Sequence, residues 1–235
     1  LYHGTTMHGR ERTADDPPEP LAYYHRGSPV GELLALHPER QRRVAVVGLG
    51  VGALAAYARP GEAWTFYEID REVERIARDA QSFRFLSSCR GRCAVVPGDG
   101  RLTLSRSTDR YDVIVLDAFS SDAVPMHLLT TEAGALYLSH LTDDGVIAFH
   151  LSNKFLDLPR VVDRMATALG VPAIGRVDVV PDDGAGASTS VWVMVAPQRA
   201  ALEPLGNRAD WKWLTPDHGA PWTDDFSSLW GVVRW

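Results

Sequence analysis

Polar side chains follow one expected strand after another in this sequence. Apolar segments at 44–47, 64–67, 93–96, 111–116 and 145–149 are expected to be strands. The polar residues that come soon after the last four segments are Glu68, Asp70, Asp99, Asp117, His150, Ser152 and Asn153. Because the carboxyl ends of parallel strands meet at one edge of a sheet, we expect these side chains to line a common site.

Three glycines, Gly48, Gly50 and Gly52, follow the first of these segments at alternate positions. Glycine permits a tight turn and lets a ligand approach the backbone without meeting a Cβ atom. A strand, a glycine turn, a short helix at 53–58 and a second strand that ends in an acid form half of a nucleotide-binding fold. The spacing G-x-G-x-G differs from the dinucleotide fingerprint, and no Lys-Ser or Lys-Thr pair follows it. A nucleoside site is therefore predicted, and its acidic lining favours a cationic nucleoside such as S-adenosylmethionine.

The order of the expected elements predicts a doubly wound α/β fold with a Rossmann-like, mostly parallel sheet of seven strands. Helices are expected at 31–37, 71–80, 101–105, 131–140 and 158–169. The last two strands, at 173–179 and 190–195, are expected to form an antiparallel pair at the edge of the sheet. Three parts are predicted: an N-terminal segment with short β-compatible pieces at 1–31, a nucleoside-binding catalytic domain at 32–197, and a tryptophan-rich tail at 198–235 that packs on that domain.

Composition limits the class of protein. The chain has 235 residues, of which 45% are hydrophobic and 23% are charged, as is typical of a globular protein. The net charge of −6 argues against nucleic acid as the main partner, since nucleic-acid-binding proteins usually carry a basic surface. No apolar run approaches the roughly 20 residues of a membrane span, and no signal-peptide pattern is present. We therefore expect a cytoplasmic protein, either alone or tethered to a membrane segment outside this chain.

The two cysteines, Cys89 and Cys93, are too few for a zinc site and make no disulfide framework. We expect them to be reduced thiols, as is usual for intracellular proteins. No metal site is expected elsewhere in the sequence. The chain begins at Leu1 and not at Met, so a preceding segment, a tag or another domain stays open.

Six pieces of the sequence, taken in order, carry a resemblance to a known family: HGTTMHGRE, YYH, VVGLGVG, YEID, PGDG and YDVIVLDAFSSD. The chain resembles the spermidine synthase (polyamine aminopropyltransferase) family, within the wider class of S-adenosylmethionine-dependent methyltransferase folds. It is most similar to bacterial spermidine synthase-like domains, some of which are fused to membrane transporter segments. The resemblance covers most of the chain, and it implies a small β-structured lid before the Rossmann-like domain.

The resemblance also implies roles for individual residues. Toward the donor, Glu68 would hold the ribose hydroxyls, Asp99 would bind the adenine amino group, and His8 falls where a glutamine usually contacts the nucleoside. Toward the acceptor, Asp117 matches the aspartate that deprotonates the attacking amine, and Tyr24 matches the tyrosine that positions it. Further residues assigned to acceptor binding are His25, Asp122, His150 and Asn153.

The chain departs from the family at two positions that bear on the donor. The glycine loop of the family usually carries an aspartate that contacts the aminopropyl amine, and here that position is Val51. A glutamate often follows the Tyr-His pair, and here that position is Arg26. An acid at position 51 would repel the carboxylate of intact S-adenosylmethionine, and Arg26 would attract it. The co-substrate is therefore expected to be either decarboxylated or intact S-adenosylmethionine.

The leading hypothesis is transfer of an aminopropyl-type alkyl group from such a sulfonium donor to a small amine or polyamine. One alternative is an S-adenosylmethionine-dependent methyltransferase on the same fold. A second is a non-catalytic nucleoside-binding domain of a larger protein. The hypothesis allows for a homodimer and for fusion to a preceding membrane segment, and it includes no metal.

Overall fold

The computed structural model describes residues 2–3, 6–7, 9–118, 124–180 and 186–233. The chain separates into two compact units. Unit 1 comprises Leu1–Ser107 and Asp178–Ser190, and unit 2 comprises Thr108–Val177 and Val191–Trp235. Within the described part of the chain, the main sheet has eight strands, one more than the seven expected. The alternation of strands and helices along the chain confirms the predicted α/β fold.

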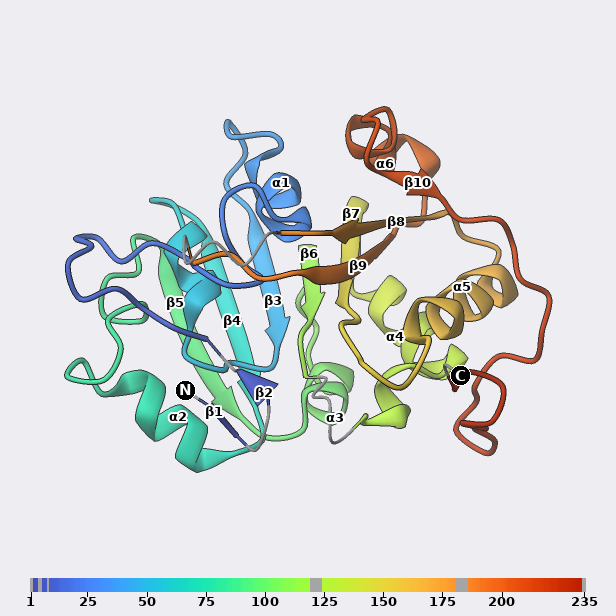
Figure 1. Cartoon of the computed structure of the whole chain (residues 1–235), viewed down its shortest axis with the longest axis horizontal. Coiled ribbons are helices and arrows are strands. Elements are labelled where there is room, and N and C mark those ends of the chain that lie inside the picture. The colour runs from blue at the N-terminus through green and yellow to red at the C-terminus, as the bar shows by residue number, and fades with distance from the viewer. Residues whose placement is uncertain (1, 4–5, 8, 119–123, 181–185, 234–235) are drawn as a thin grey trace. The chain divides into compact units, whose positions relative to one another are not determined.

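Unit 1 contains three parallel strands that lie side by side in the order β3, β4, β5 (Figure 1). Their bounds are β3 Arg43–Val47, β4 Ala63–Glu68 and β5 Arg92–Pro97. The helices of this unit are α1 Pro29–Ala35, the 3₁₀ helix η1 Ala53–Tyr57, α2 Arg71–Arg78 and α3 Gly100–Ser105. Two short antiparallel strands, β1 (Tyr2–His3) and β2 (Thr6–Met7), begin the chain.

A buried ion pair stabilises the amino-terminal ends of the strands in unit 1. The Arg42 guanidinium lies 3.2 Å from the Glu62 carboxylate, and both side chains are almost fully buried. Glu62 also accepts hydrogen bonds from the Arg59 backbone N–H and the Trp64 indole N–H. Burial by itself raises the pKa of Glu62, but these hydrogen bonds and the charge of Arg42 outweigh it and hold that pKa below its usual value.

Replacing this carboxylate is expected to weaken unit 1 in a pH-dependent way. Because Glu62→Gln leaves the buried charge of Arg42 uncompensated, it should lower the free energy of unfolding by about 3 kcal/mol at pH 7. The folded pKa of Glu62 is depressed, so its contribution is present above the unfolded value and is lost as the pH falls through the folded value. Urea unfolding should therefore show the wild-type and variant curves converging below about pH 4. The exposed Glu39→Gln control should stay within about 0.5 kcal/mol at pH 7, and an equal loss there would refute the burial argument.

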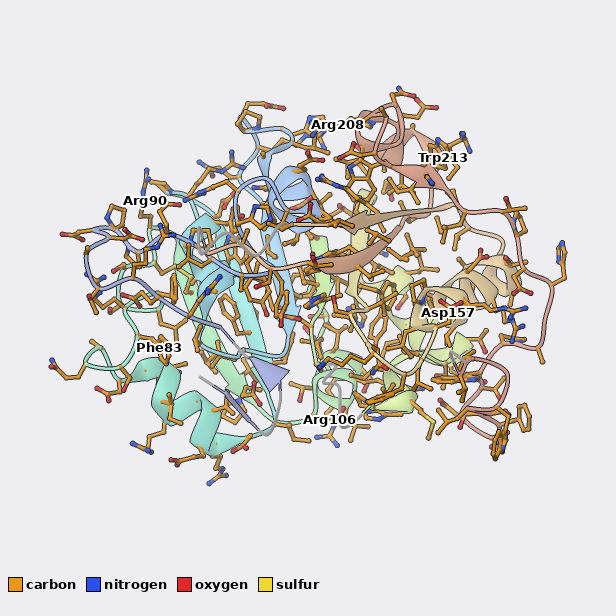
Figure 2. The ribbon with its side chains drawn as sticks, in the orientation of Figure 1. Phe83, Arg90, Arg106, Asp157, Arg208 and Trp213 are labelled. Carbon is orange, nitrogen blue, oxygen red and sulfur yellow. A yellow bond between two sulfur atoms is a disulfide. The ribbon has the colours of Figure 1, made fainter. Side chains whose placement is uncertain are left out.

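The two cysteines of unit 1 correct the expectation of reduced thiols. Cys89 and Cys93 form a disulfide, with their Cα atoms 6.3 Å apart. Arg90, labelled in Figure 2, lies between the two cysteines in the turn that leads into β5, and Cys93 belongs to that strand. Spacing alone could not reveal this bond, because it depends on a turn that brings the two Cβ atoms together.

Unit 2 contains the other five strands of the main sheet, in the order β10, β8, β9, β7, β6. Their bounds are β6 Tyr111–Leu116, β7 Leu141–His150, β8 Ala173–Asp178, β9 Ser190–Val195 and β10 Lys212–Trp213. β6 and β7 pair in parallel, β9 pairs antiparallel with β7, and β10 pairs antiparallel with β8. The last residue of β8 and the first of β9 belong to unit 1. The expected edge position of β8 and β9 is wrong, because the two-residue strand β10 lies outside them.

The helices of unit 2 are the 3₁₀ helix η2 Met126–Leu128, α4 Thr131–Ser139, α5 Leu158–Leu169 and α6 Arg199–Gly206. Helices α4 and α5 pack beside each other (Figure 1). None of the helices in the described ranges is long and apolar enough to cross a bilayer.

The C-terminal tail is held together by a cation–π contact and is attached to helix α5 by ion pairs. Trp211 and Trp222 are buried, whereas Trp230 is 80% exposed. The Arg199 guanidinium lies 3.5 Å from the ring centroid of Trp213, which Figure 2 labels on β10. Asp217 accepts hydrogen bonds from Arg160 and Arg164 of α5, and the Arg160 contact is the main reason that the pKa of Asp217 falls to about 2.

Candidate functional site

The glycine loop of unit 1 has the backbone that its sequence predicts. Gly48, Gly50 and Gly52 have φ angles of 99°, 54° and 80°, a region that residues with a Cβ atom rarely adopt. Gly52 N–H donates to the Leu49 carbonyl, which closes the turn before η1. The loop therefore makes a tight turn between β3 and η1. Its three glycines place no Cβ atom where a ligand could approach the backbone.

Glu68 fixes this loop to the end of β4. One carboxylate oxygen accepts the Leu49 N–H at 2.9 Å, and the other accepts the Asp70 N–H at 2.8 Å. The side chain is buried. A carboxylate has about four lone-pair positions, so two backbone bonds leave it able to accept further hydroxyl groups. The residue predicted to bind the ribose is thus held in place by two backbone hydrogen bonds.

Asp70 and Asp99, at the ends of β4 and β5, begin the helices that follow them. The Asp70 carboxylate accepts the Glu72 N–H at the start of α2, and the Asp99 carboxylate accepts the Leu102 N–H at the start of α3. Each satisfies a backbone donor that the helix leaves unpaired. Asp99 therefore has a structural role, which neither establishes nor contradicts its predicted contact with adenine.

Two large apolar side chains beside these acids were not predicted as site residues. Ile69, between Glu68 and Asp70, is 71% exposed, and Leu102, in the first turn of α3, is 58% exposed. Exposed apolar groups near the carboxyl ends of parallel strands can pack against the faces of a flat ring. The alternation of acid and apolar residues in the sequence YEID was the available signal.

The N-terminal segment packs directly on the glycine loop. A Cβ atom added at Gly9 would lie 2.4 Å from a methyl carbon of Val51, so only glycine permits this approach. Val51 is completely buried. Farther along, Glu11 pairs with Arg84 at 2.6 Å. Residue 51, expected to face the donor, is thus covered by this chain's own backbone.

The Tyr24-His25-Arg26 sequence places three side chains in different environments. The Tyr24 side chain is buried, and its carbonyl accepts a hydrogen bond from the Tyr57 hydroxyl. His25 Nε2 lies 2.8 Å from the carboxylate of Asp178, a partner that the sequence did not suggest. Arg26 pairs with Glu19. The guanidinium that we expected to attract a donor carboxylate therefore already has an acidic partner.

In unit 2, Asp117 directly follows β6, and His150 is the last residue of the adjacent strand β7. Because Leu116 of β6 lies opposite Phe149 of β7, the next residues, Asp117 and His150, come together. His150 Nδ1 is 2.7 Å from Asp117 Oδ1, and both side chains are mostly buried. His150 Nε2 is 2.9 Å from Ser152 Oγ. Trp192 of β9 stacks on the imidazole with ring centroids 4.5 Å apart.

The remaining predicted site residues are placed as follows. The Asn153 side-chain oxygen accepts the N–H groups of Phe155 and Leu156, so it shapes the turn after β7. His8 and Asp122 lie outside the described residues. Among the residues that are described, no group of three or more His, Cys, Asp or Glu side chains is arranged to hold a metal ion.

Comparison with protein-family models gives no match. A polyamine aminopropyltransferase of Vibrio vulnificus is 34% identical over 140 residues, 56% of this chain and 44% of that protein. A probable polyamine aminopropyl transferase of Bifidobacterium longum is 28% identical over 110 residues, 46% of this chain and 23% of that protein. The solved structure of a probable spermidine synthase from Corynebacterium glutamicum superposes with a TM-score of 0.55 at 17% identity, covering 80% of this chain and 74% of that one. Over about half of its length the chain is similar to polyamine aminopropyltransferases, and its fold is similar to that of a spermidine synthase.

The wider fold class is also evident from a second solved structure. Human methyltransferase-like protein 13, solved in complex with SAH, superposes with a TM-score of 0.53 at 21% identity, covering 83% of this chain and 93% of that one. At such identities the structural likeness shows the fold alone. The chain spans less than half the length of the two curated relatives that it matches.

Proposed function

We propose that this chain catalyses transfer of an aminopropyl-type alkyl group from a sulfonium derivative of adenosine to a small amine. The observation that carries the proposal is the Glu68 carboxylate, fixed at the end of β4 and bonded to the glycine loop. A carboxylate in this position can accept both hydroxyls of a ribose, as a nucleoside donor requires. The reaction class is supported by the aminopropyltransferase relatives, and a spermidine synthase of the same fold is solved with the transition-state analogue AdoDATO.

The proposed donor site uses groups of unit 1. Glu68 binds the ribose hydroxyls, and the glycine loop receives the nucleoside against its backbone. Asp99 accepts from the adenine amino group, while the exposed Ile69 and Leu102 contact the faces of the adenine ring. The donor is decarboxylated or intact S-adenosylmethionine, and in either case its sulfonium carbon is the electrophile.

The proposed chemistry uses Asp117 as the base. The acceptor nitrogen attacks the carbon next to sulfur, the carbon–sulfur bond breaks, and its electron pair stays on sulfur as a neutral thioether. The amine proton passes to the Asp117 carboxylate. Since the sulfonium is already a good leaving group, orientation of the two reactants supplies most of the rate. Tyr24 orients the acceptor, and His25, Asp122 and Asn153 contribute to its binding.

Product analysis tests this proposal. The chain is incubated with each donor and a panel of diamines and polyamines, and the nucleoside product is identified by mass spectrometry. Methylthioadenosine together with an alkylated amine is the expected result. S-Adenosylhomocysteine would identify a methyltransferase instead, and nucleoside binding by calorimetry without any product would identify a binding domain.

A further inference from the structure

The imidazole of His150 has polar partners on both ring nitrogens. On one side, Nδ1 lies 2.7 Å from Asp117 Oδ1, and on the other, Nε2 lies 2.9 Å from Ser152 Oγ. Its ring is stacked almost parallel on Trp192, with an interplanar angle of 9°. The histidine is therefore fixed by two hydrogen bonds and by stacking on Trp192. Both of its ring nitrogens have hydrogen-bond partners within unit 2.

The hydrogen-bond directions in this cluster follow from Asp117 and agree with the Val191 N–H. A carboxylate only accepts, so His150 Nδ1 is the donor to Asp117 Oδ1. A backbone N–H can only donate, and that of Val191 lies 3.0 Å from Ser152 Oγ, so the serine oxygen accepts there. Its own hydroxyl hydrogen is then available to donate to His150 Nε2. A neutral imidazole that accepts at Nε2 carries its proton at Nδ1, and this proton points at the Asp117 carboxylate.

We infer that His150 is a positioning residue for Asp117, and that Ser152 fixes the tautomer that this role requires. The inference rests on the proposed function. It adds a residue of the same site, His150, that holds the proposed base Asp117 in position. By donating to Oδ1, His150 fixes the rotamer of the carboxylate that takes the amine proton. His150 keeps its own Nδ1 proton throughout, so the proton balance of the reaction is unchanged. In this role His150 acts through Asp117 and does not itself bind the acceptor.

Two substitutions separate this role from simple packing. His150→Phe keeps a ring to stack on Trp192 but removes both nitrogens. His150→Asn loses the ring but places an amide N–H close to where Nδ1 was. If His150 positions Asp117, kcat should fall about tenfold or more in the Phe variant and recover largely in the Asn variant, because a hydrogen bond to a charged group has about this effect. The KM for the donor should stay within about twofold in both, since only the base is affected.

A kcat that is higher in the Phe variant than in the Asn variant overturns the inference. If the Phe variant is as active as wild type, or more active than the Asn variant, the role of His150 is packing against Trp192. In that case Asp117→Asn would still lose most of its turnover, so the proposed function would stand. If wild type forms no product with any donor and amine, the proposed function fails instead.

A second measurement needs no turnover. Nitrogen-15 NMR of the imidazole in the full chain, at about pH 8, where an unperturbed histidine is neutral, should show His150 protonated at Nδ1. Ser152→Ala and Asp117→Ala should each shift the tautomer population toward Nε2–H. A wild-type His150 protonated at Nε2, or a tautomer that neither variant changes, would contradict the inference whatever the enzyme activity.

Discussion

Asp117→Asn should lower the turnover number by about 10²- to 10⁴-fold, the usual contribution of a positioned general base. The amide is nearly the same size as the carboxylate and can still accept the His150 Nδ1–H, so the fold should be unchanged. It cannot take a proton from the amine. The affinity for the donor, measured by calorimetry, should change by less than about twofold, because the residues proposed to bind the ribose and adenine are untouched.

The same strand offers a matched control for this substitution. Asp112 lies near the start of β6, where its carboxylate accepts a hydrogen bond from the Thr142 hydroxyl. Asp112→Asn changes the net charge by the same amount but leaves Asp117 in place, and it should keep nearly full turnover. Methylthioadenosine formation measured for both variants decides the question. Equal activity of Asp117→Asn and wild type would remove Asp117 from the mechanism.

Val51→Asp should destabilise unit 1 by at least about 3 kcal/mol, because it places a carboxylate in a fully buried apolar position. Restoring the family's acid by one substitution is therefore expected to cost stability and not to change donor preference. Burial raises the pKa of such a carboxylate, so the loss should shrink as the pH falls toward about 4, where the group becomes neutral. Urea unfolding of wild type and variant at pH 7 and at about pH 4 measures both effects.

Val51→Asn provides the uncharged counterpart. It has nearly the same shape as the aspartate and does not ionise, so its destabilisation should be smaller at pH 7 and nearly independent of pH. A Val51→Asp variant as stable as wild type would show that the Gly9 segment moves aside easily. In that case position 51 would again be a candidate for selecting the donor.

The central strands could be predicted from the sequence because they are buried on both faces. Tyr111–Leu116 is almost entirely apolar, and the structure has β6 at that range. Helix α5 at Leu158–Leu169 is likewise where its amphipathic pattern and the following Gly170 place it. β10 could not be predicted, because two residues carry no periodicity. The segment at 53–58 was expected to be an ordinary helix and is a 3₁₀ helix of five residues.

The candidate site was predictable in its positions but not in its contacts. The order of apolar and polar residues was enough to place Glu68, Asp99 and Asp117 at or just after the ends of strands. The partner of each depends on which residue lies opposite on a neighbouring strand or loop, and a single sequence does not contain that register. The stacking of His150 on Trp192 and the pairing of His25 with Asp178 are contacts of this kind.

The two hydrogen bonds of Glu68 have a consequence for ligand affinity. They join the glycine loop to the end of β4 through bonds made within the chain itself. A flexible loop would have to lose conformational entropy when it closes on a ligand, and that loss is subtracted from the binding free energy. Here most of that ordering has already taken place during folding of the chain. If Glu68 binds the nucleoside as proposed, the stability of unit 1 and the affinity for that ligand are linked through a single carboxylate.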